Sequence, residues 1–398
     1  MKRTICAVIT ARASYARIKS ALAAIRDHPD LTLRIVVAGS AVLERYGDIR
    51  AQMHADGFEI AAWTTFIVEG ENLVSSVKST GLGLIEMGTV LDRMAPDAVI
   101  SVADRYETLA TAVAASYMNI RLAHTQGGEL TGSIDESVRH AITRLAHIHF
   151  PATEQARERL IDMGEDPESV FWVGCPSLDL IPSTDLSLNG LFDRYTGVGA
   201  PVDPSKPYLV VVQHSVTTEY GQAWDQVWET LRAIARLRMQ TVWLWPNVDA
   251  GSDDISKGLR VFREQHKPEY IHFYRNFAPE DYLKLINNCA CLVGNSSSAI
   301  REGAFLGVPA VNVGTRQQGR ERGPNVVDVG YDEEEILKAI KQQMEHGKYP
   351  SDHTYGDGHA GERIARVLAE YEPAVQKRLY MGRWSSWSHQ QAAATFWG

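Results

Sequence analysis

Short apolar runs alternate with stretches of helical periodicity along almost the whole chain, and this alternation limits the possible folds more than any other feature. In the first half the apolar runs lie at residues Ile5–Ile9, Leu33–Val37, Ala98–Val102, Arg121–His124, His147–Phe150 and Val170–Val173. Most gaps between them have a helical pattern, at residues Tyr15–Arg26, Asn72–Arg93, Glu107–Tyr117 and Thr153–Met163. This rhythm is typical of a parallel sheet wrapped by helices.

The alternation stops in a segment rich in Pro, Ser, Asp and Gly, residues 176–207, and then begins again. The later apolar runs lie at Tyr208–Val212, Thr241–Trp245, Tyr270–Tyr274, Ala290–Val293, Ala310–Val313 and Val326–Val329, with helical patterns between them such as Glu219–Leu237 and Pro279–Asn288. We therefore predict an α/β protein with two Rossmann-like, doubly wound domains that face each other across a cleft. We expect the first domain at residues 1–180, a connection at 181–207, the second domain at 208–365, and a C-terminal helix and tail at 366–398.

The end of the chain has a helical pattern at Glu362–Leu379, followed by a tail that contains Trp384, Trp387 and Trp397. The sequence leaves three alternatives open for this tail: a docked aromatic segment, an oligomer contact or a disordered end.

The composition argues against several classes of protein. The 398 residues carry a formal net charge of −9 without a long basic stripe, which argues against a nucleic-acid partner. The chain has no run of about 18 apolar residues, and its brief N-terminal apolar run indicates a strand and not a signal peptide. We therefore expect no membrane partner and a cytoplasmic location. The cysteine spacing does not suit zinc, and small core residues in a reducing compartment are the expected role of Cys6, Cys175, Cys289 and Cys291.

Residues 292–323 contain the clearest candidate for a phosphate site. The run Cys289–Val293 predicts a buried strand, and Ser296, Ser297 and Ser298 are expected to open a helix that ends near Gly307. Hydroxyls and free N–H groups at the start of a helix bind phosphate well, although a serine N-cap on an ordinary helix is an equal alternative. Glu302 could accept hydrogen bonds from a ribose diol, and Arg316, Arg320 and Arg322 could add positive charge.

Acidic and basic side chains also follow two predicted strands of the first domain. Asp104 and Arg105 come directly after one strand, where Asp104 either belongs to a site or caps the next helix. The next strand leads into residues 124–140, which hold His124, Gln126, Glu129, Asp135, Glu136, Arg139 and His140 around a Gly-Gly turn. Such a loop is a candidate for general acid–base work, and a solvated loop with Asp135 as a helix cap is the alternative.

Three further candidates lie at predicted strand ends: Arg12, His214 and Asn247. The guanidinium of Arg12 could bind a diphosphate held by the opposite domain. A single histidine such as His214 more often has a structural role, and Asn247 is equally consistent with a plain turn. The chain has no dinucleotide-binding glycine pattern after its first strand and no P-loop, and residues 81–88 have the wrong glycine spacing. A bound nicotinamide cofactor is therefore disfavoured.

Taken together, these blocks resemble the hydrolysing UDP-N-acetylglucosamine 2-epimerases, especially the branch that makes N-acetylmannosamine for sialic acid. The resemblance runs from about residue 2 to 380, and its most specific pieces are ADRYETLA, HTQGGELTGSIDESVRHAITRLAHIHF, HSVTTE, WPNVDAG, GNSSSAIREGAFLGVPAVNVGTRQQGRE and YGDGHA. It implies a two-domain fold like that of the GT-B glycosyltransferases, with the active site between the domains. It also implies a C-terminal helix that crosses back to the first domain, a homodimer or homotetramer, and no cofactor or metal.

The resemblance also implies roles for single residues. The nucleotide and diphosphate contacts would be Arg12, Arg105, His214, Asn247, Ser296, Ser297, Glu302 and Arg316, with Arg139 as a further candidate substrate contact. Asp104 and Asp135 match acidic groups of the catalytic set. Gln126 departs from the glutamate that related enzymes carry there, and an amide cannot take a proton. Proton transfer would then fall to Asp104, Glu129, Asp135 and His214, and we hypothesise that Gln126 marks a changed substrate or a changed proton route.

The implied reaction converts UDP-N-acetylglucosamine to N-acetylmannosamine and UDP through a 2-acetamidoglucal. The same chemistry on UDP- or GDP-linked N,N′-diacetylbacillosamine, for legionaminic acid, is the first alternative. A second alternative is a glycosyltransferase of the same fold, which would leave the carboxylate-rich loop unexplained. A third is a protein that binds a sugar nucleotide without catalysis, which the presence of Gln126 leaves open.

Overall fold

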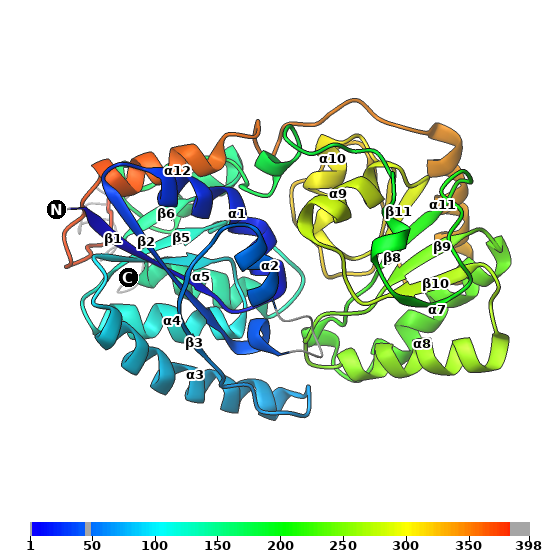
Figure 1. Ribbon diagram of the computed structural model, residues 1–398, viewed down its shortest axis with the longest axis horizontal. Coiled ribbons are helices and arrows are strands. Elements are labelled where there is room, and N and C mark those ends of the chain that lie inside the picture. Colours follow the sequence, from blue (N-terminus) through cyan, green and yellow to red (C-terminus); the bar gives the residue numbers. More distant parts are fainter. Residues whose placement is uncertain (1, 44–48, 383–398) are drawn as a thin grey trace, which may run out of the picture.

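The computed structural model describes residues 2–43 and 49–382, which form two α/β units side by side (Figure 1). The first unit has a sheet of parallel strands: β1 (Arg3–Ile9), β2 (Leu31–Ala38), β3 (Ile60–Thr64), β4 (Ala98–Val102), β5 (Arg121–Thr125) and β6 (Ile148–Phe150). Helices connect these strands: α1 (Arg12–Asp27), α2 (Arg50–Ala55), α3 (Leu73–Met94), α4 (Tyr106–Tyr117), α5 (Asp135–Leu145) and α6 (Glu154–Asp162).

The second unit repeats this plan. Its strands are β7 (Gly197–Gly199), β8 (Leu209–Val212), β9 (Thr241–Leu244), β10 (Ile271–Tyr274), β11 (Cys291–Gly294), β12 (Ala310–Val313) and β13 (Val326–Val329). Its helices are α7 (Ala223–Leu237), α8 (Ser252–His266), α9 (Pro279–Asn287), α10 (Glu302–Phe305) and α11 (Glu333–His346). Only β7 runs antiparallel to its neighbour, β10, and all other strand pairs in the described sheets are parallel.

The strand order places the ligand-binding edge of each sheet. The orders are β3-β2-β1-β4-β5-β6 and β13-β12-β11-β8-β9-β10-β7, so the chain changes direction between β1 and β4 and between β8 and β11. In such doubly wound sheets, ligands bind beyond the carboxyl ends of the strands at these points. The strands β4 and β8 are buried throughout, as expected for parallel strands with both faces covered. The predicted fold class is thereby confirmed.

Three predicted elements differ from the structure. Residues Val170–Val173 form no strand, and only Val170 makes an isolated bridge, to His149. Pro151 directly follows β6 and has no N–H, so a parallel ladder with residues 170–173 lacks one hydrogen bond, and only its carbonyl oxygen accepts, from Val173 N–H at 3.3 Å. The predicted helix at Glu362–Leu379 is instead α12 (Ala360–Glu370), which ends before Pro373 because a residue preceding proline disfavours helical geometry.

The third difference concerns the serine segment. The helix expected from Ser296 to Gly307 is a 3-10 turn at Ser297–Ala299 followed by the single-turn helix α10. Arg301 separates them with φ −100° and ψ −83°, which is not helical. The strand β3, the helix α2 and the edge strand β7 were not predicted from the sequence, and β7 lies inside the expected connection at residues 181–207.

The chain returns to the first unit at its end, where α12 lies along α1 (Figure 1). Ile364, Ala365 and Leu368 of α12 join the same buried cluster as Ile18 and Leu22 of α1. We propose the domain limits given above with one change: the whole of α12, residues 360–370, and the described part of the tail lie on the first domain, so the second domain ends before Ala360. The tryptophans of the tail lie outside the described residues. Among the described helices, none is long and apolar enough to cross a membrane.

The contact between α12 and α1 is close enough to test. A Cβ at Gly361 would lie 2.7 Å from the carbonyl carbon of Ser20 and 2.8 Å from the amide nitrogen of Ala21. We expect Gly361→Ala to lower the free energy of unfolding by about 1–3 kcal/mol in urea denaturation, because these backbone atoms must move. Gly81→Ala in α3 is the matched control, since a Cβ there meets no atom within 4 Å. Equal stabilities of the two variants would contradict the expectation.

Candidate functional site

A cavity of about 420 Å³ lies between the two units, at the carboxyl ends of their sheets. Its walls come from α2 and from the segments that follow β1, β8, β9, β10, β11 and β12, among others. Seven of the residues predicted from the sequence line it: Arg12, His214, Asn247, Ser296, Ser297, Glu302 and Arg316. Aromatic side chains of Tyr195, Trp245, Phe277 and Tyr282 line it as well. The cavity therefore combines cations, hydroxyls and ring surfaces, which suits a charged ligand that carries a planar base.

The serine segment presents hydroxyls to this cavity. The Ser296 and Ser298 hydroxyls lie 2.9 Å apart, and Ser298 Oγ also lies 2.6 Å from the hydroxyl of Tyr282. Because α10 has a single turn, the phosphate argument based on a helix dipole does not hold here, and side-chain groups must supply the contacts. Glu302 also lines the cavity, and its Oε2 is buried without a hydrogen-bond partner among the described residues. This oxygen is free to accept from a ligand hydroxyl.

His214 is held as a neutral donor. Its backbone N–H donates to Asn295 Oδ1 (2.7 Å), and the Asn295 side chain donates to its carbonyl oxygen (2.8 Å). The ring atom Nδ1 accepts from the backbone N–H of Asn247 at 3.1 Å, so the proton of the neutral ring is on Nε2. Burial, followed by the charge of Arg316, lowers the pKa of His214 to about 3. The ring can therefore donate to an anion, and it is a poor acceptor of protons at neutral pH.

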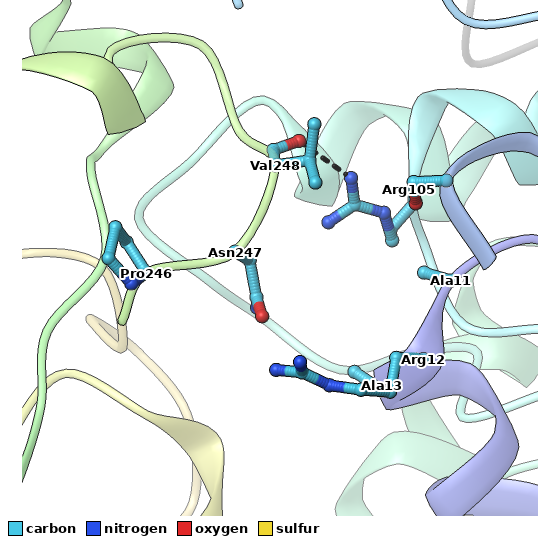
Figure 2. A pocket seen from close by; sticks show the side chains of 8 residues that line it. Ala11, Arg12, Ala13, Arg105, Pro246, Asn247 and Val248 are labelled. Carbon is cyan, nitrogen blue, oxygen red and sulfur yellow. Dashed lines mark hydrogen bonds between the residues drawn. The ribbon is translucent and has the colours of Figure 1, made fainter. Parts of the chain in front are cut away.

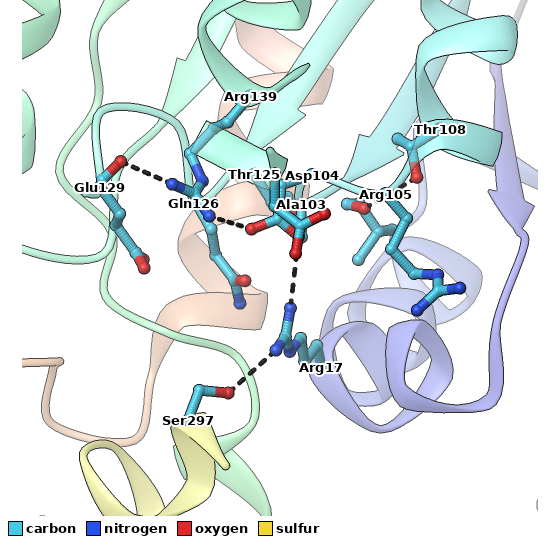
Figure 3. Close-up of polar contacts among 12 residues, drawn as sticks. Arg17, Ala103, Asp104, Arg105, Thr108, Thr125, Gln126, Glu129, Arg139 and Ser297 are labelled. Atoms are coloured by element: carbon cyan, nitrogen blue, oxygen red, sulfur yellow. Dashed lines mark hydrogen bonds and ion pairs between the residues drawn. The ribbon is translucent and has the colours of Figure 1, made fainter. Parts of the chain in front are cut away.

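Asp104 and Arg139 form the charged centre on the first unit (Figure 3). Arg139 donates to Asp104 Oδ2 and, at 2.6 Å, to the carbonyl oxygen of Glu129. Arg17 of α1 approaches Asp104 Oδ1 at 4.0 Å and donates to Ser297 Oγ of the second unit at 2.9 Å. Burial alone would raise the pKa of Asp104, but Arg139, Arg17 and Arg320 outweigh it and lower that pKa. Asp104 is therefore a fixed negative charge.

Glu129 is also held as an anion, although it was predicted as a proton carrier. It is 1% exposed and ion-paired with Arg301 and, at 3.1 Å, with Arg320, both from the second unit. Burial would raise the pKa of Glu129, but Arg301, Arg320 and Arg139 outweigh it and lower that pKa. A carboxylate held in this way is poorly suited to accept a proton near pH 7.

Asp135 has the opposite environment. It is the first residue of α5, whose N-cap is Ile134, so the alternative that Asp135 caps this helix is wrong. Burial and the negative charges of Asp104 and Asp249 raise the pKa of Asp135 to about 6. Likewise, Arg105 and not Asp104 is the N-cap residue of α4. A carboxyl that titrates near neutral pH beside fixed charges is a candidate general base or acid.

Gln126 sits in the turn after β5 and is 2% exposed. Its φ of +61° lies in the left-handed region, and its N–H donates to the carbonyl oxygen of Phe150 at 2.9 Å. The side-chain Nε2 donates to Cys175 Sγ at 3.3 Å, while Oε1 is buried without a partner in the described structure. His124, on β5, donates from Nε2 to the carbonyl oxygen of Ala103 (2.9 Å) and is a structural group.

Arg105 does not line the large cavity. It donates to Asp249 Oδ1 (2.7 Å), to Glu107 Oε2 (3.1 Å) and to the carbonyl oxygen of Val248 (2.9 Å). Figure 2 shows this last bond beside a smaller pocket into which Arg12 extends toward Asn247. Arg105 thus joins the two units through a partly buried ion pair. The diphosphate contact that the resemblance implies for Arg105 stays a prediction. In the described part of the chain, His, Cys, Asp and Glu side chains form no group of three or more that could hold a metal ion.

Comparison with known proteins gives the family. Residues 23–369 match the model of the UDP-N-acetylglucosamine 2-epimerase family. The chain belongs to this family. It is 33% identical to a UDP-N,N′-diacetylbacillosamine 2-epimerase (hydrolyzing) of Legionella pneumophila, with 92% of this chain and 96% of the relative covered. It is 31% identical to a UDP-N-acetylglucosamine 2-epimerase of Neisseria meningitidis, with 95% and 99% covered.

Solved structures agree with the fold. A Neisseria meningitidis UDP-GlcNAc 2-epimerase bound to UDP-GlcNAc has a TM-score of 0.75 at 16% identity, with 92% of this chain and 100% of that chain covered. A Methanocaldococcus jannaschii UDP-GlcNAc 2-epimerase in complex with UDP-GlcNAc and UDP has a TM-score of 0.75 at 18% identity, with the same coverage. The family and the GT-B-like fold expected from the sequence motifs are thereby confirmed.

Two residues of the site were not identified from the sequence. Arg17 lies within the predicted helix Tyr15–Arg26 and was not predicted as a site residue. Arg301 was not predicted either, although its neighbour Glu302 was. A signal for Arg301 exists, because it stands in the largely apolar stretch 299–308, and an arginine that is carried into an interior needs a paired anion. The sequence alone does not say which anion.

The role of Arg105 can be tested through stability. We expect Arg105→Met to lower the free energy of unfolding by about 3–5 kcal/mol, because it leaves the fully buried Glu107 and the partly buried Asp249 without this cation. Guanidinium denaturation would measure the change. Adding Glu107→Gln to Arg105→Met should restore part of the stability. Unchanged stability with a large loss of nucleotide affinity would instead support the diphosphate role.

Proposed function

We propose that this family member is a hydrolysing 2-epimerase that converts UDP-N-acetylglucosamine to N-acetylmannosamine and UDP. The observation that carries the proposal is that Asp104 and Asp135 lie close to each other and to Arg17 and Arg316, two arginines that line the cavity between the units. The Neisseria meningitidis relative bears the name of an enzyme with this substrate, and the family resemblance supports nucleotide-sugar binding. We further propose that the protein is cytoplasmic and assembles as a homodimer or homotetramer.

The chemistry assigns separate tasks to the two sides of the cavity. A base takes the C2 proton of the sugar while the C1–O bond to UDP breaks, which gives a 2-acetamidoglucal and UDP. Water then supplies hydroxide to C1, and a proton returns to C2 from the other face. The diphosphate gains charge as it departs, so donors from Ser297, His214 and Arg316 are placed to stabilise it. Glu302 would hold the ribose diol, and no cofactor is required.

Asp135 is our proposed proton carrier. Gln126 cannot accept a proton, Glu129 is held by two arginines, and His214 stays neutral, so these three groups are poor candidates for the base. Asp104 is anchored by Arg139 and acts as a fixed charge beside Asp135. The carboxyl of Asp135 changes its charge near the working pH, which is the property that proton transfer requires.

A second candidate substrate is UDP- or GDP-N,N′-diacetylbacillosamine. The observation that favours it is the 33% identity to the Legionella pneumophila enzyme named for the UDP-linked sugar, over 96% of that enzyme. A Campylobacter jejuni relative named for the GDP- and UDP-linked forms is 28% identical. The reaction would be the same, and the difference would lie in the groups that contact C4 and C6 of the sugar.

Proton NMR in D₂O tests the activity directly. With UDP-N-acetylglucosamine we expect release of UDP and N-acetylmannosamine with deuterium at C2, because the proton on C2 comes from solvent. The same experiment with UDP-N,N′-diacetylbacillosamine is the comparison. Turnover of that sugar alone would transfer the proposal to the second candidate. Binding of UDP without turnover of either sugar nucleotide would reject both and leave a binding protein.

The pH dependence tests the role of Asp135. As a base it must be deprotonated, so kcat/KM should rise with pH through about 6 and level off above it. We expect Asp135→Asn to remove this rise and to lower kcat by about 10²–10⁴-fold. The control is Glu136→Gln, which keeps an oxygen for the N–H of Thr131 and should keep the profile. Persistence of the rise in Asp135→Asn would exclude Asp135 as its source.

A further inference from the structure

Arg301 lies inside the molecule between the two units and is 2% exposed. It stands at the break between the turn Ser297–Ala299 and α10, and its backbone N–H donates to the carbonyl oxygen of Ser297 at 3.1 Å. Its neighbour in sequence, Glu302, lines the cavity with a buried oxygen that has no partner in the described structure. One short segment therefore faces the proposed nucleotide site with Ser297 and Glu302 and carries Arg301.

The guanidinium of Arg301 is directed to the first unit. It is ion-paired with Glu129, and Nη1 lies 3.3 Å from Cys175 Sγ. Its plane also lies over the ring of Tyr355, with 4.8 Å between the guanidinium carbon and the ring centroid. Because the guanidinium contacts several groups, its position is fixed, and it does more than neutralise the charge of Glu129.

Further contacts connect Glu129 to Asp104 and then return to Ser297. The carbonyl oxygen of Glu129 accepts from Arg139, which is paired with Asp104. Asp104 faces Arg17, and Arg17 donates to Ser297 Oγ, where the path began (Figure 3). The two units are thus joined by a closed ring of contacts, which we call the contact ring: Ser297, Arg301, Glu129, Arg139, Asp104 and Arg17.

We propose that Arg301 is a positioning residue, which couples nucleotide binding at residues 296–302 to the geometry of the acid–base loop at residues 126–139. A nucleotide that engages Ser297 and Glu302 fixes the backbone on both sides of Arg301. Arg301 then fixes Glu129, and the carbonyl oxygen of Glu129 fixes Arg139 against Asp104. This inference rests on the proposed function, since it requires that the cavity binds a nucleotide. A purely structural role would hold the loop equally with and without nucleotide.

Hydrogen exchange with UDP as the probe separates these two roles. In the wild-type protein, we expect UDP to slow amide exchange in residues 127–139. In Arg301→Gln, UDP should still bind with a Kd within about threefold of wild type, measured by calorimetry, but the slowing in residues 127–139 should be absent. Arg301→Lys, which keeps the charge and loses the planar contacts, should show an intermediate effect. Arg236→Gln, on the exposed face of α7, is the matched control and should behave as wild type.

Kinetics add a second readout. We expect Arg301→Gln to lower kcat about 100-fold, with KM little changed, because a small displacement of catalytic groups has an effect of this size. Slowing of exchange in residues 127–139 that persists in Arg301→Gln would overturn the proposal. A kcat equal to that of Arg236→Gln would overturn it as well.

Two possible results, an unfolded Arg301→Gln variant and a wild-type protein without turnover, each leave a measurement that tests the role of Arg301. If Arg301→Gln does not fold, the double substitution Glu129→Gln with Arg301→Met removes both buried charges together, and the same loss of UDP-dependent slowing is expected. If the wild-type protein turns over no sugar nucleotide, the proposed function fails, whereas the exchange experiment with UDP still decides the role of Arg301.

Discussion

A carboxylate in a protein interior stays charged only where cations replace the lost water, and Glu129 has both of its cations on the opposite unit. This buried charge is therefore one of the interactions that fix the position of the units relative to each other. The same residue holds Arg139 through its backbone oxygen, so the centre around Asp104 depends on the closed arrangement. Arg105, which lines the smaller pocket, makes a second, partly buried connection with Asp249. Charge pairing across the interface thus places the acidic groups opposite the serine segment.

Much of the architecture could be predicted because it depends on local patterns. The alternation of apolar and helical segments requires two parallel sheets, and the carboxyl ends of their strands placed Arg12, His214, Asn247 and Ser297 at one cavity. The errors arose where distant residues decide the outcome. Pro151 lacks the N–H that a ladder with Val170–Val173 needs, and the expected helix is interrupted at Arg301, whose backbone is not helical. Its partner Glu129 lies 172 positions away, a separation that no local pattern reveals.

The roles of single residues were harder to predict than their location. Glu129, Asp135 and His214 were all candidates for proton transfer, and their chemistry differs only through surroundings that the sequence does not show. Two arginines hold Glu129 as an anion, an amide N–H fixes the tautomer of His214, and neighbouring negative charges raise the pKa of Asp135. Gln126 is an instructive case, because its amide nitrogen donates to Cys175 and its oxygen is buried without a partner among the residues that the structure describes. An amide there leaves an acceptor beside the acidic centre without adding another charge.

The return of the chain to the first unit has a consequence for how the protein is made. Ile364, Ala365 and Leu368 complete the core that β1 and α1 begin, and Arg3 donates to the carbonyl oxygens of Leu368 and Tyr371. During synthesis, residues 1–180 leave the ribosome well before these partners exist, whereas every strand of the second sheet is available by residue 329. The usual order, in which the N-terminal domain folds first, is therefore opposed by the topology. The first unit to be synthesised is the last to be completed, and its face for α12 stays uncovered until residues 360–370 have been synthesised.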